Sequence, residues 1–466
     1  MTARGRQDEA EAFAQAATRD FDAFGIHPID ADVFDETIET PIRTLRRARR
    51  HRGEGERVGY MSLVETDGIL RWQLGAGPAP SRRGPRRRAR IGLPRPAADR
   101  VIRQFKFADL PPNEIGDKLR QLDTRLTPRQ GLRDVTRTLT VGRESTPATK
   151  GRILLIVHGT FSSGDHVVEE MTSTADGRRL LERALTGGRY TQVLAFNHPT
   201  LSVSPILNAA ALAHHFRTSD ADVDVICHSR GGLVVRWWLE VLDHRSQPRG
   251  RVIFAGPPLA GTGLAAPARL RGALNLLTNL SHALGTLART TGRVFPAAAP
   301  IGEAAGVLFG MFGKLTALAA RTPIIDAGIA MIPGLAGQSR EGANGELLRL
   351  RDSFSQLEGT LRTERYLVNY YFLKSNFEPA DPAWRFWQYF RRDRLLDAAA
   401  DLVFDGPNDL VVDTDSMASL ADGIADEEID VGRIETFGGT SVDVHHLNYF
   451  QQPETLSLIR NALQLA

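Results

Sequence analysis

This chain contains a serine, an aspartate and a histidine that together could carry out acyl transfer. The sequence around each of them suits that role. Ser229 lies in the stretch Cys-His-Ser-Arg-Gly-Gly at 227–232, and Asp409 and His446 follow it in that order. A serine hydroxyl is a weak nucleophile at neutral pH, and the usual base that activates it is a histidine oriented by a buried carboxylate. These residues therefore predict attack on a carbonyl group through a covalent acyl intermediate.

The residues around Ser229 predict a sharp turn between a strand and a helix. Residues 223–227 form an apolar, β-branched run typical of a buried strand, and the apolar residues after Gly232 recur at helical spacing. A serine on such a turn, a nucleophile elbow, exposes its hydroxyl at the carboxyl edge of a sheet, beside the N–H groups of the helix. The usual pattern is Gly-x-Ser-x-Gly, and here Cys227 replaces the first glycine. Taken alone, the stretch also fits an ordinary helix N-cap at Ser229.

The candidate acid and base come late in the chain. Asp409 ends a Pro-Asn-Asp turn ahead of the apolar residues 410–412, and His446 precedes a Tyr-Phe pair at a spacing that favours it over His445. Turn formation or helix capping would also explain an acidic residue in this region. Its other acidic residues are Asp405, Asp413 and Asp415.

Two backbone N–H groups are expected to bind the oxyanion that forms during attack. One is the N–H of Arg230, the residue after the nucleophile. The other comes from the loop after the first strand of this region, at Thr160 or Phe161, and we take Thr160 as the candidate. His158 and Gly159 are expected to shape that loop.

The chain divides into two regions of different character. From residue 150, strands and helices alternate, which predicts one α/β domain over 150–466 with a mostly parallel sheet and helices on both faces. Residues 263–350 interrupt the alternation with apolar helical stretches and are predicted to form a helical cap. Residues 1–149 are predicted to be a separate α+β region of unknown role, with a hairpin at 60–74 and an Arg- and Pro-rich linker at about 75–100.

Composition excludes several classes of protein. The apolar content of 42% and the charged content of 24% in 466 residues are those of a globular protein. A net charge of only +3 does not indicate nucleic-acid binding, and a single cysteine excludes a disulfide framework. The first residues lack the apolar core of a signal peptide, and no stretch reaches about 18 uninterrupted apolar residues. We therefore expect a cytoplasmic protein.

Several short stretches together resemble one family. In order they are Val-His-Gly-Thr-Phe at 157–161, the elbow at 227–232, Pro-Leu-Ala-Gly-Thr at 258–262, Pro-Asn-Asp at 407–409 and His-Leu-Asn-Tyr-Phe at 446–450. The chain over about 150–466 resembles the lipase-type branch of the α/β-hydrolase superfamily, and is similar to bacterial triacylglycerol lipases and to the GPI-inositol-deacylase-like group. The resemblance implies a mixed eight-stranded sheet and hydrolysis of an ester or thioester without a metal. The order serine, aspartate, histidine along the chain is the α/β-hydrolase order.

The sequence thus predicts a serine hydrolase that cleaves esters of apolar acyl groups. Ser229 is the expected nucleophile, His446 the base and Asp409 its partner, while Thr160 and Arg230 supply the oxyanion hole. We expect a small-molecule or lipid ester as substrate, no cofactor and no nucleic acid. The apolar cap is a candidate for peripheral contact with a membrane, and the N-terminal region a candidate for binding a protein partner.

Two other functions also fit the sequence. The same triad could serve an acyltransferase or a peptidase, which differ in whether an alcohol, an amine or water takes the acyl group. A hydrolase-like scaffold could also bind a partner without catalysis, because one fold hosts many functions.

Overall fold

The computed structural model describes most of the chain. The described residues are 10–16, 18–19, 21–29, 58–66, 68–75, 100–108, 114–243, 245, 250–266, 269–318, 332–340, 344–378, 384, 386, 403–404, 406–422, 429–438 and 444–465. The linker predicted at about 75–100 lies almost wholly outside them, as does Asp405. None of the helices in these ranges is both long and apolar enough to cross a membrane.

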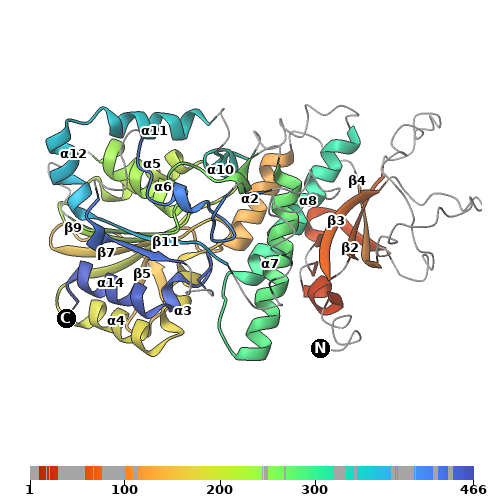
Figure 1. The fold of residues 1–466 in the computed structure, drawn as a ribbon, viewed down its shortest axis with the longest axis horizontal. Helices are drawn as coiled ribbons and strands as arrows, with labels where there is room; N and C mark the ends of the chain where they lie inside the picture. Colours follow the sequence, from red (N-terminus) through yellow and green to blue (C-terminus); the bar gives the residue numbers. More distant parts are fainter. Residues whose placement is uncertain are drawn as a thin grey trace, which may run out of the picture.

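The centre of the molecule is a mixed sheet of eight strands (Figure 1). Its spatial order is β12-β11-β10-β9-β7-β8-β5-β6, and the six strands from β12 to β8 are parallel, whereas β5 and β6 are antiparallel to their neighbours. The strands are β5 (Gly131–Val135), β6 (Val141–Glu144), β7 (Arg152–Val157), β8 (Gln192–Asn197), β9 (Asp222–His228), β10 (Val252–Ala255), β11 (Tyr370–Ser375) and β12 (Ile434–Phe437). The five central strands β7 to β11 are apolar and almost fully buried, as expected for a sheet covered on both faces.

Helices cover both faces of this sheet, each over its own apolar core (Figure 1). One face carries α5 (Pro205–Phe216), α6 (Gly231–Arg236) with its π-helical continuation Trp237–Leu242, α11 (Gly345–Ser355) and α12 (Gly359–Arg365). The other face carries α3 (Gly164–Thr172), α4 (Ala175–Thr186) and α14 (Pro453–Leu463). This architecture confirms the predicted α/β-hydrolase fold class.

The sheet begins earlier in the chain than the sequence suggested. Strands β5 and β6 both precede residue 150, where we placed the start of the α/β domain, yet they form its edge beside β8. Residues 136–140 form the turn between β5 and β6. Leu139 there has a φ of 60°, and the Thr136 N–H donates to the Thr140 carbonyl at 2.9 Å.

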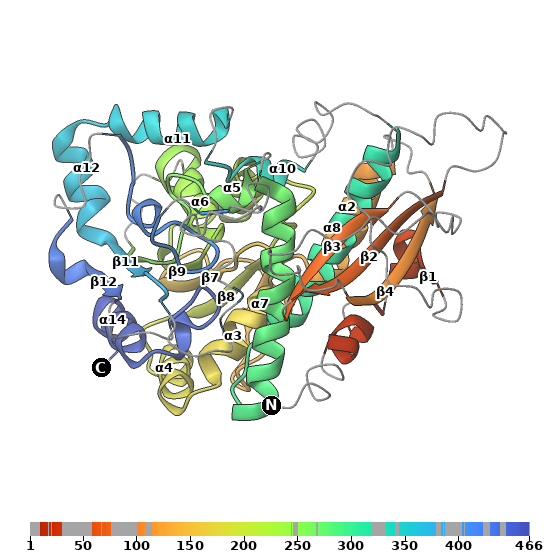
Figure 2. The same ribbon diagram turned by 45° about the vertical axis from the view of Figure 1, so that its right-hand side comes forward.

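A second, antiparallel sheet of four strands stands apart from the first (Figure 2). Its order is β1-β4-β2-β3, from β1 (Ile26–Ile29), β2 (Val58–Thr66), β3 (Ile69–Gly75) and β4 (Arg100–Ala108). The predicted hairpin is confirmed, since Thr66 pairs with Ile69 across a turn in which Gly68 has a φ of +83°. A side chain is rarely tolerated at that φ, which is why the turn uses glycine.

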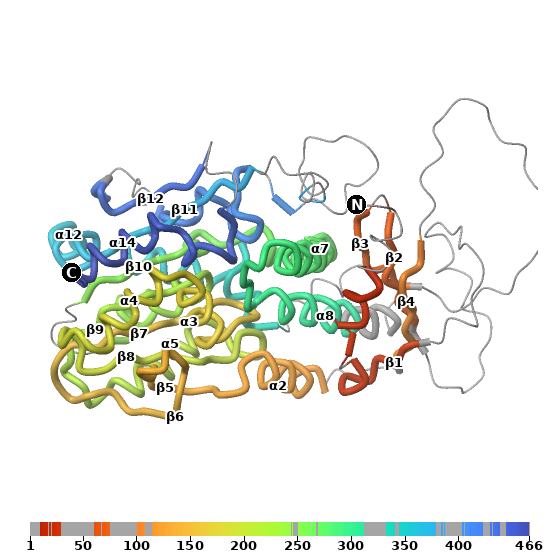
Figure 3. The backbone as a smooth tube through the Cα atoms, turned by 90° about the horizontal axis from the view of Figure 1, so that it is seen from below, coloured from red at the N-terminus to blue at the C-terminus, as the bar shows by residue number. Residues whose placement is uncertain are grey.

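The helices between β10 and β11 join the two sheets. Helices α7 (Leu270–Thr291) and α8 (Ala298–Leu318) pack against each other and against the second sheet, with α2 (Ile115–Leu126) beside them (Figure 3). On α7, Asn279 bonds both the N–H and the carbonyl of Leu70, and Asn275 accepts the Trp72 N–H. These amides satisfy the open edge of β3 much as another strand would. The same apolar core includes Phe161 and Leu447, which flank the site described next.

Candidate active site

Ser229 lies on the sharp turn that the sequence predicted. It joins β9 to α6 and has a φ of 54°, a left-handed conformation that is uncommon for a residue with a side chain. A side chain on Gly231 would come within 2.6 Å of the Val157 carbonyl oxygen, so the helix can pack there only with glycine. Cys227 is 1% exposed and its thiol faces the Ile253 carbonyl, so this residue packs within the sheet in place of the usual glycine.

Asp409 and His446 form a buried, hydrogen-bonded pair. The distance from His446 Nδ1 to Asp409 Oδ2 is 2.7 Å, and the two residues are 3% and 0% exposed. An ionised carboxylate only accepts hydrogen bonds, so Nδ1 carries the proton and Nε2 is left as an acceptor. The other carboxylate oxygen accepts the N–H groups of Val411 and Val412, at 3.1 and 2.8 Å. The pair therefore holds the imidazole in the tautomer that a general base needs.

The Asp409–His446 pair lies next to the elbow. The Ser229 N–H donates to the Ala255 carbonyl at 2.8 Å, and the next residue, Gly256, would bring an added Cβ to 2.9 Å from Asp409 Oδ2 and 3.2 Å from His446 Nδ1. Within the described residues, no hydrogen bond joins the Ser229 hydroxyl to His446. Such contacts are often loose in the absence of substrate.

The structure separates the two neighbouring histidines. His445 does not contact Asp409; its Nδ1 accepts the Leu447 N–H at 3.2 Å, and its ring packs among Phe295, Phe377 and Trp384. Burial lowers the pKa of His445 to about 3. Of the two, only His446 is therefore placed to work with Asp409.

The competing carboxylates have other partners. Asp413 accepts the Gly263 N–H and pairs with Arg340, and Asp415 pairs with the same arginine. They hold the loop that follows β10 against the loop that carries Asp409. This matches the structural role that the sequence left open for them.

The candidate oxyanion donors flank the serine. A Cβ on Gly159 would lie 2.6 Å from Ser229 Cβ, so the loop after β7 packs directly against Ser229. The Phe161 N–H is committed to the Thr200 hydroxyl at 3.3 Å. Within the described residues, the N–H groups of Thr160 and Arg230 donate no hydrogen bond. They are therefore available to a developing negative charge.

Two further histidines brace the site rather than act as bases. His158 donates from Nδ1 to the Gly159 carbonyl and accepts the His198 N–H at Nε2, at 2.9 and 3.0 Å. His228 donates from Nε2 to the His446 carbonyl at 2.7 Å. Burial lowers the pKa of both His158 and His228 to about 3, so both rings stay neutral at physiological pH.

Comparison with known proteins assigns the chain to a family. The model of the family described as "Domain of unknown function (DUF7379)" matches residues 124–464. The chain belongs to the DUF7379 family. The match begins before residue 150 and includes β5 and β6, the two strands that the sequence placed outside the α/β domain. A search of curated proteins found no match to this DUF7379 chain.

The DUF7379 chain is similar in structure to three bacterial enzymes of known structure. They are the Bacillus licheniformis lipase BlEst2 in its propeptide form (TM-score 0.34, 15% identity, 71% of this chain and 52% of that chain), the Legionella pneumophila phospholipase PlaB (0.32, 15%, 57% and 45%) and lipase 1 from Pelosinus fermentans (0.37, 12%, 67% and 98%). The matched part spans about half the length of the first two proteins.

Several residues of the DUF7379 site were not singled out from the sequence. Tyr449 donates its hydroxyl to Asp409 Oδ2 at 2.9 Å, and Gln338 donates to the Thr160 hydroxyl at 2.9 Å. The spacing from His446 to Tyr449 was a usable signal for the tyrosine. Nothing local marks Gln338, because its partner lies 178 residues away.

A buried glutamate makes the stability of the histidine loop depend on pH. Glu170 on α3 accepts the Phe450 N–H at 2.9 Å, and burial raises its pKa from 4.5 to about 8. Between pH 4.5 and about 8 the folded chain binds more protons than the unfolded chain. The stability that protonated Glu170 contributes is therefore full below pH 4.5 and is lost as pH rises through about 8. The effect is about 1.4 kcal/mol for each unit of pKa shift.

Glu170→Gln is therefore expected to shrink the fall in melting temperature between pH 5 and pH 9. The amide stays neutral at both values, and its oxygen can still accept the Phe450 N–H. The exposed neighbour Glu169 supplies the matched control, and Glu169→Gln should keep the wild-type pH dependence. Equal slopes for the two variants in thermal melts would contradict this assignment.

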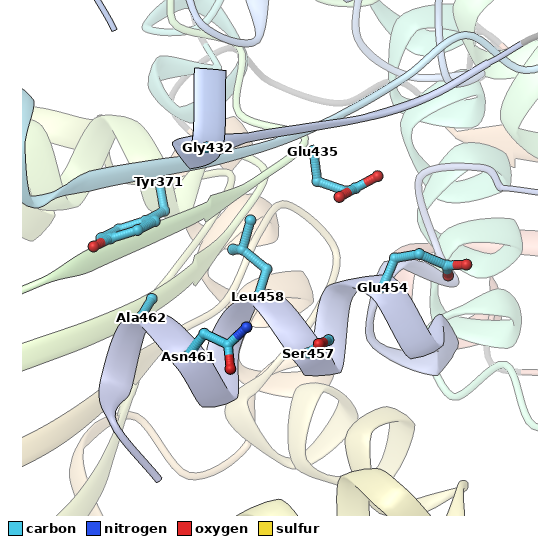
Figure 4. A pocket seen from close by; sticks show the side chains of 8 residues that line it. All are labelled: Tyr371, Gly432, Glu435, Glu454, Ser457, Leu458, Asn461 and Ala462. Atoms are coloured by element: carbon cyan, nitrogen blue, oxygen red, sulfur yellow. The ribbon is translucent and has the colours of Figure 1, made fainter. Parts of the chain in front are cut away.

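A shallow cleft elsewhere on the DUF7379 domain is separate from this site. It lies between β11, β12 and α14, and Figure 4 shows Glu435 and Glu454 on opposite sides of it. Its lining residues are Tyr371, Gly432, Glu435, Glu454, Ser457, Leu458, Asn461 and Ala462. None of the candidate catalytic residues is among them, so we assign this cleft no part in the chemistry.

Proposed function

We propose that the protein is a serine hydrolase that cleaves carboxylic esters of apolar acyl groups. Its fold is the lipase-type α/β-hydrolase fold, and its candidate machinery is Ser229, His446 and Asp409 with the N–H groups of Thr160 and Arg230. The observation that carries the proposal is the buried His446–Asp409 pair at 2.7 Å, set beside a serine held in a left-handed conformation at the start of a helix.

Backbone strain supports the same set of residues. Five non-glycine residues of the described chain have a positive φ. Three of them belong to the proposed site: Ser229, Phe161 in the oxyanion loop, and Leu410, which follows Asp409. Each such residue costs of order 1–3 kcal/mol, and such strain clusters at functional sites. The three strained positions correspond to the proposed nucleophile, oxyanion donor loop and acid.

The proposed reaction has two halves. The Ser229 hydroxyl attacks the ester carbonyl carbon while His446 Nε2 takes its proton, and Asp409 stabilises the imidazolium that forms. The oxygen of the tetrahedral intermediate binds the N–H groups of Thr160 and Arg230. Collapse breaks the bond to the alcohol, which leaves with the proton from His446. Water then attacks the acyl-enzyme and gives up a proton to His446. The bond to Ser229 Oγ breaks, His446 returns the proton to that oxygen, and the acid is released.

The preference for apolar acyl groups rests on the apolar segments around the site. Ser229 and His446 are 4% and 3% exposed, so a substrate needs an opening movement to reach them. Within the cap predicted at 263–350, we propose α7 and α8 as the part that moves, and the second sheet, which packs against them, as the region that supports it. A cytoplasmic location, contact of the cap with a membrane and a protein partner for the N-terminal region remain predictions.

The test is hydrolysis of p-nitrophenyl esters of increasing acyl length by the wild type and by Ser229→Ala. The wild type should hydrolyse them, with kcat/KM rising from acetate to longer chains. Ser229→Ala should lower kcat by about 10⁴-fold or more at every length, because no other group can form the acyl-enzyme. A Ser229→Ala variant with full activity would rule the proposal out.

A further inference from the structure

A buried carboxylate outside the predicted hydrolase region holds a turn beside the candidate site. Asp123, near the end of α2, is 1% exposed. Its oxygens accept the N–H groups of Thr200, Leu201 and Ser202 at 2.7, 2.9 and 2.7 Å. Hydrogen bonds to an ionised acceptor are about twice as strong as neutral ones. Three of them on consecutive residues leave this turn little freedom.

The turn holds one side of the oxyanion loop. The Thr200 hydroxyl donates to Asp123 Oδ1 at 3.4 Å and accepts the Phe161 N–H at 3.3 Å. Phe161 has a φ of 56° and follows Thr160, whose N–H is a proposed oxyanion donor. A residue in this conformation keeps it only where its surroundings impose it. The Thr200 hydroxyl therefore links the carboxylate to the conformation of the loop.

A second link reaches the side chain of Thr160. The Gly334 N–H donates to the Leu201 carbonyl at 3.0 Å, and an added Cβ on Gly334 would come within 1.9 Å of the Thr200 carbonyl oxygen. This close fit seats residues 332–340 on the turn. From there Gln338 donates to the Thr160 hydroxyl at 2.9 Å. The turn thus contacts the oxyanion loop from two directions.

The other proposed oxyanion residue also reaches this segment. The Arg230 side chain is fully buried and donates from Nη2 to the Val203 carbonyl at 2.6 Å. Residues 200–203 therefore form hydrogen bonds with the surroundings of both proposed oxyanion donors. Asp123 is the charged group that fixes them in place.

We infer that Asp123 is a positioning residue for the oxyanion hole, acting through the turn at 200–202 and the Thr200 hydroxyl. The inference rests on the proposed function, because the loop it positions is the proposed oxyanion loop. It gives α2 a part in catalysis without contact with substrate. It predicts a loss in kcat rather than in substrate binding, since the oxyanion forms only during the reaction.

Thr200→Val provides the primary test, because it removes the hydroxyl and keeps the shape. With p-nitrophenyl butyrate, kcat is expected to fall about 10- to 100-fold while KM stays within about threefold. Thr200→Ser restores a hydroxyl and should return kcat to within about threefold of the wild type. Asp123→Asn should likewise lower kcat and leave KM within about threefold of the wild-type value.

Tyr190→Phe is the matched control. Tyr190, just before β8, is buried, and its hydroxyl donates to the buried carboxylate of Asp224 at 2.8 Å, at the opposite end of β9 from Ser229. The substitution therefore also removes one hydroxyl contact to a buried aspartate. It should lower the melting temperature without changing kcat or KM. A kcat for Thr200→Val no lower than that for Tyr190→Phe would overturn the inference, as would a folded Asp123→Asn variant with wild-type kcat.

The proposed function and this inference fail in distinguishable ways. Loss of hydrolysis in Ser229→Ala together with wild-type kcat in Thr200→Val would remove the inference and leave the hydrolase. Absence of Ser229-dependent hydrolysis in the wild type would remove both. If Asp123→Asn does not fold, the comparison of Thr200→Val with Thr200→Ser and Tyr190→Phe decides the inference.

Discussion

His446→Ala is expected to lower kcat/KM for a short-chain ester by about 10⁴-fold or more, whereas His445→Asn should leave it within about tenfold of the wild type. Only His446 meets Asp409, at 2.7 Å, and only its Nε2 is left free of a proton for the serine. His445 instead accepts the Leu447 N–H within an aromatic cluster, with its pKa lowered to about 3 by burial.

The two variants form a matched pair, because each removes one of two adjacent buried imidazoles. In His445→Asn the amide oxygen can take the place of Nδ1 and accept the Leu447 N–H, so the loop should keep its path. We expect a loss of stability of about 1–3 kcal/mol for this variant, typical of a buried polar substitution. Steady-state kinetics checked against thermal melts separates the two effects. A larger catalytic loss in His445→Asn than in His446→Ala would reverse the assignment of the base.

Asp409→Asn is expected to lower kcat by about 10³- to 10⁴-fold with little change in KM. The asparagine amide can donate to Nδ1, which favours the tautomer with the proton on Nε2 and takes away the acceptor that the serine needs. The loss of charge also leaves the imidazolium of the transition state without its partner. Steady-state kinetics with p-nitrophenyl butyrate measures kcat and KM separately and checks this expectation.

Tyr449→Phe should lower kcat less than Asp409→Asn does. It removes the hydroxyl that donates to Asp409 Oδ2 at 2.9 Å and leaves the bonds from Val411, Val412 and His446 in place. We expect a loss of kcat of less than about tenfold. If Asp409→Asn lost no more activity than Tyr449→Phe, Asp409 would not be the carboxylate that orients the base.

The fold class could be predicted because its signal is local. The parallel strands from β7 to β11 are short apolar runs, and β7 to β10 are each followed by a helix, so this alternation is visible without any knowledge of contacts. The elbow is local for the same reason, since strand, serine, glycines and helix are consecutive. The order of the three candidate catalytic residues then follows from the chain itself.

The edge strands and the contacts between distant segments could not be predicted. Strand β5 shows no regular alternation of buried residues, and β6 buries only Val141, so neither pattern reveals that it pairs with the large sheet. The bond from Asp123 to Thr200 spans 77 residues, and that from Asn279 to Leu70 spans 209. Asparagine and aspartate in helices are commonly solvated, and only the folded chain shows which of them meet a backbone.

The choice between His445 and His446 could be predicted from the sequence only in part. Spacing alone favoured His446, but both histidines fit a loop after the last strand. Asp409 Oδ2 favours His446, because it accepts hydrogen bonds from His446 Nδ1 and from Tyr449, three residues later in the chain. The pairing is a property of the folded loop rather than of the local sequence.

The most direct test of the central claim is reaction of the folded protein with a small fluorophosphonate, followed by mass-spectrometric mapping of the modified peptide. The account predicts one modification per chain, on Ser229, and its complete loss in Ser229→Ala with an unchanged circular dichroism spectrum. A modification that persists in Ser229→Ala would contradict the account. So would a folded wild-type protein that neither reacts with the probe nor hydrolyses p-nitrophenyl acetate.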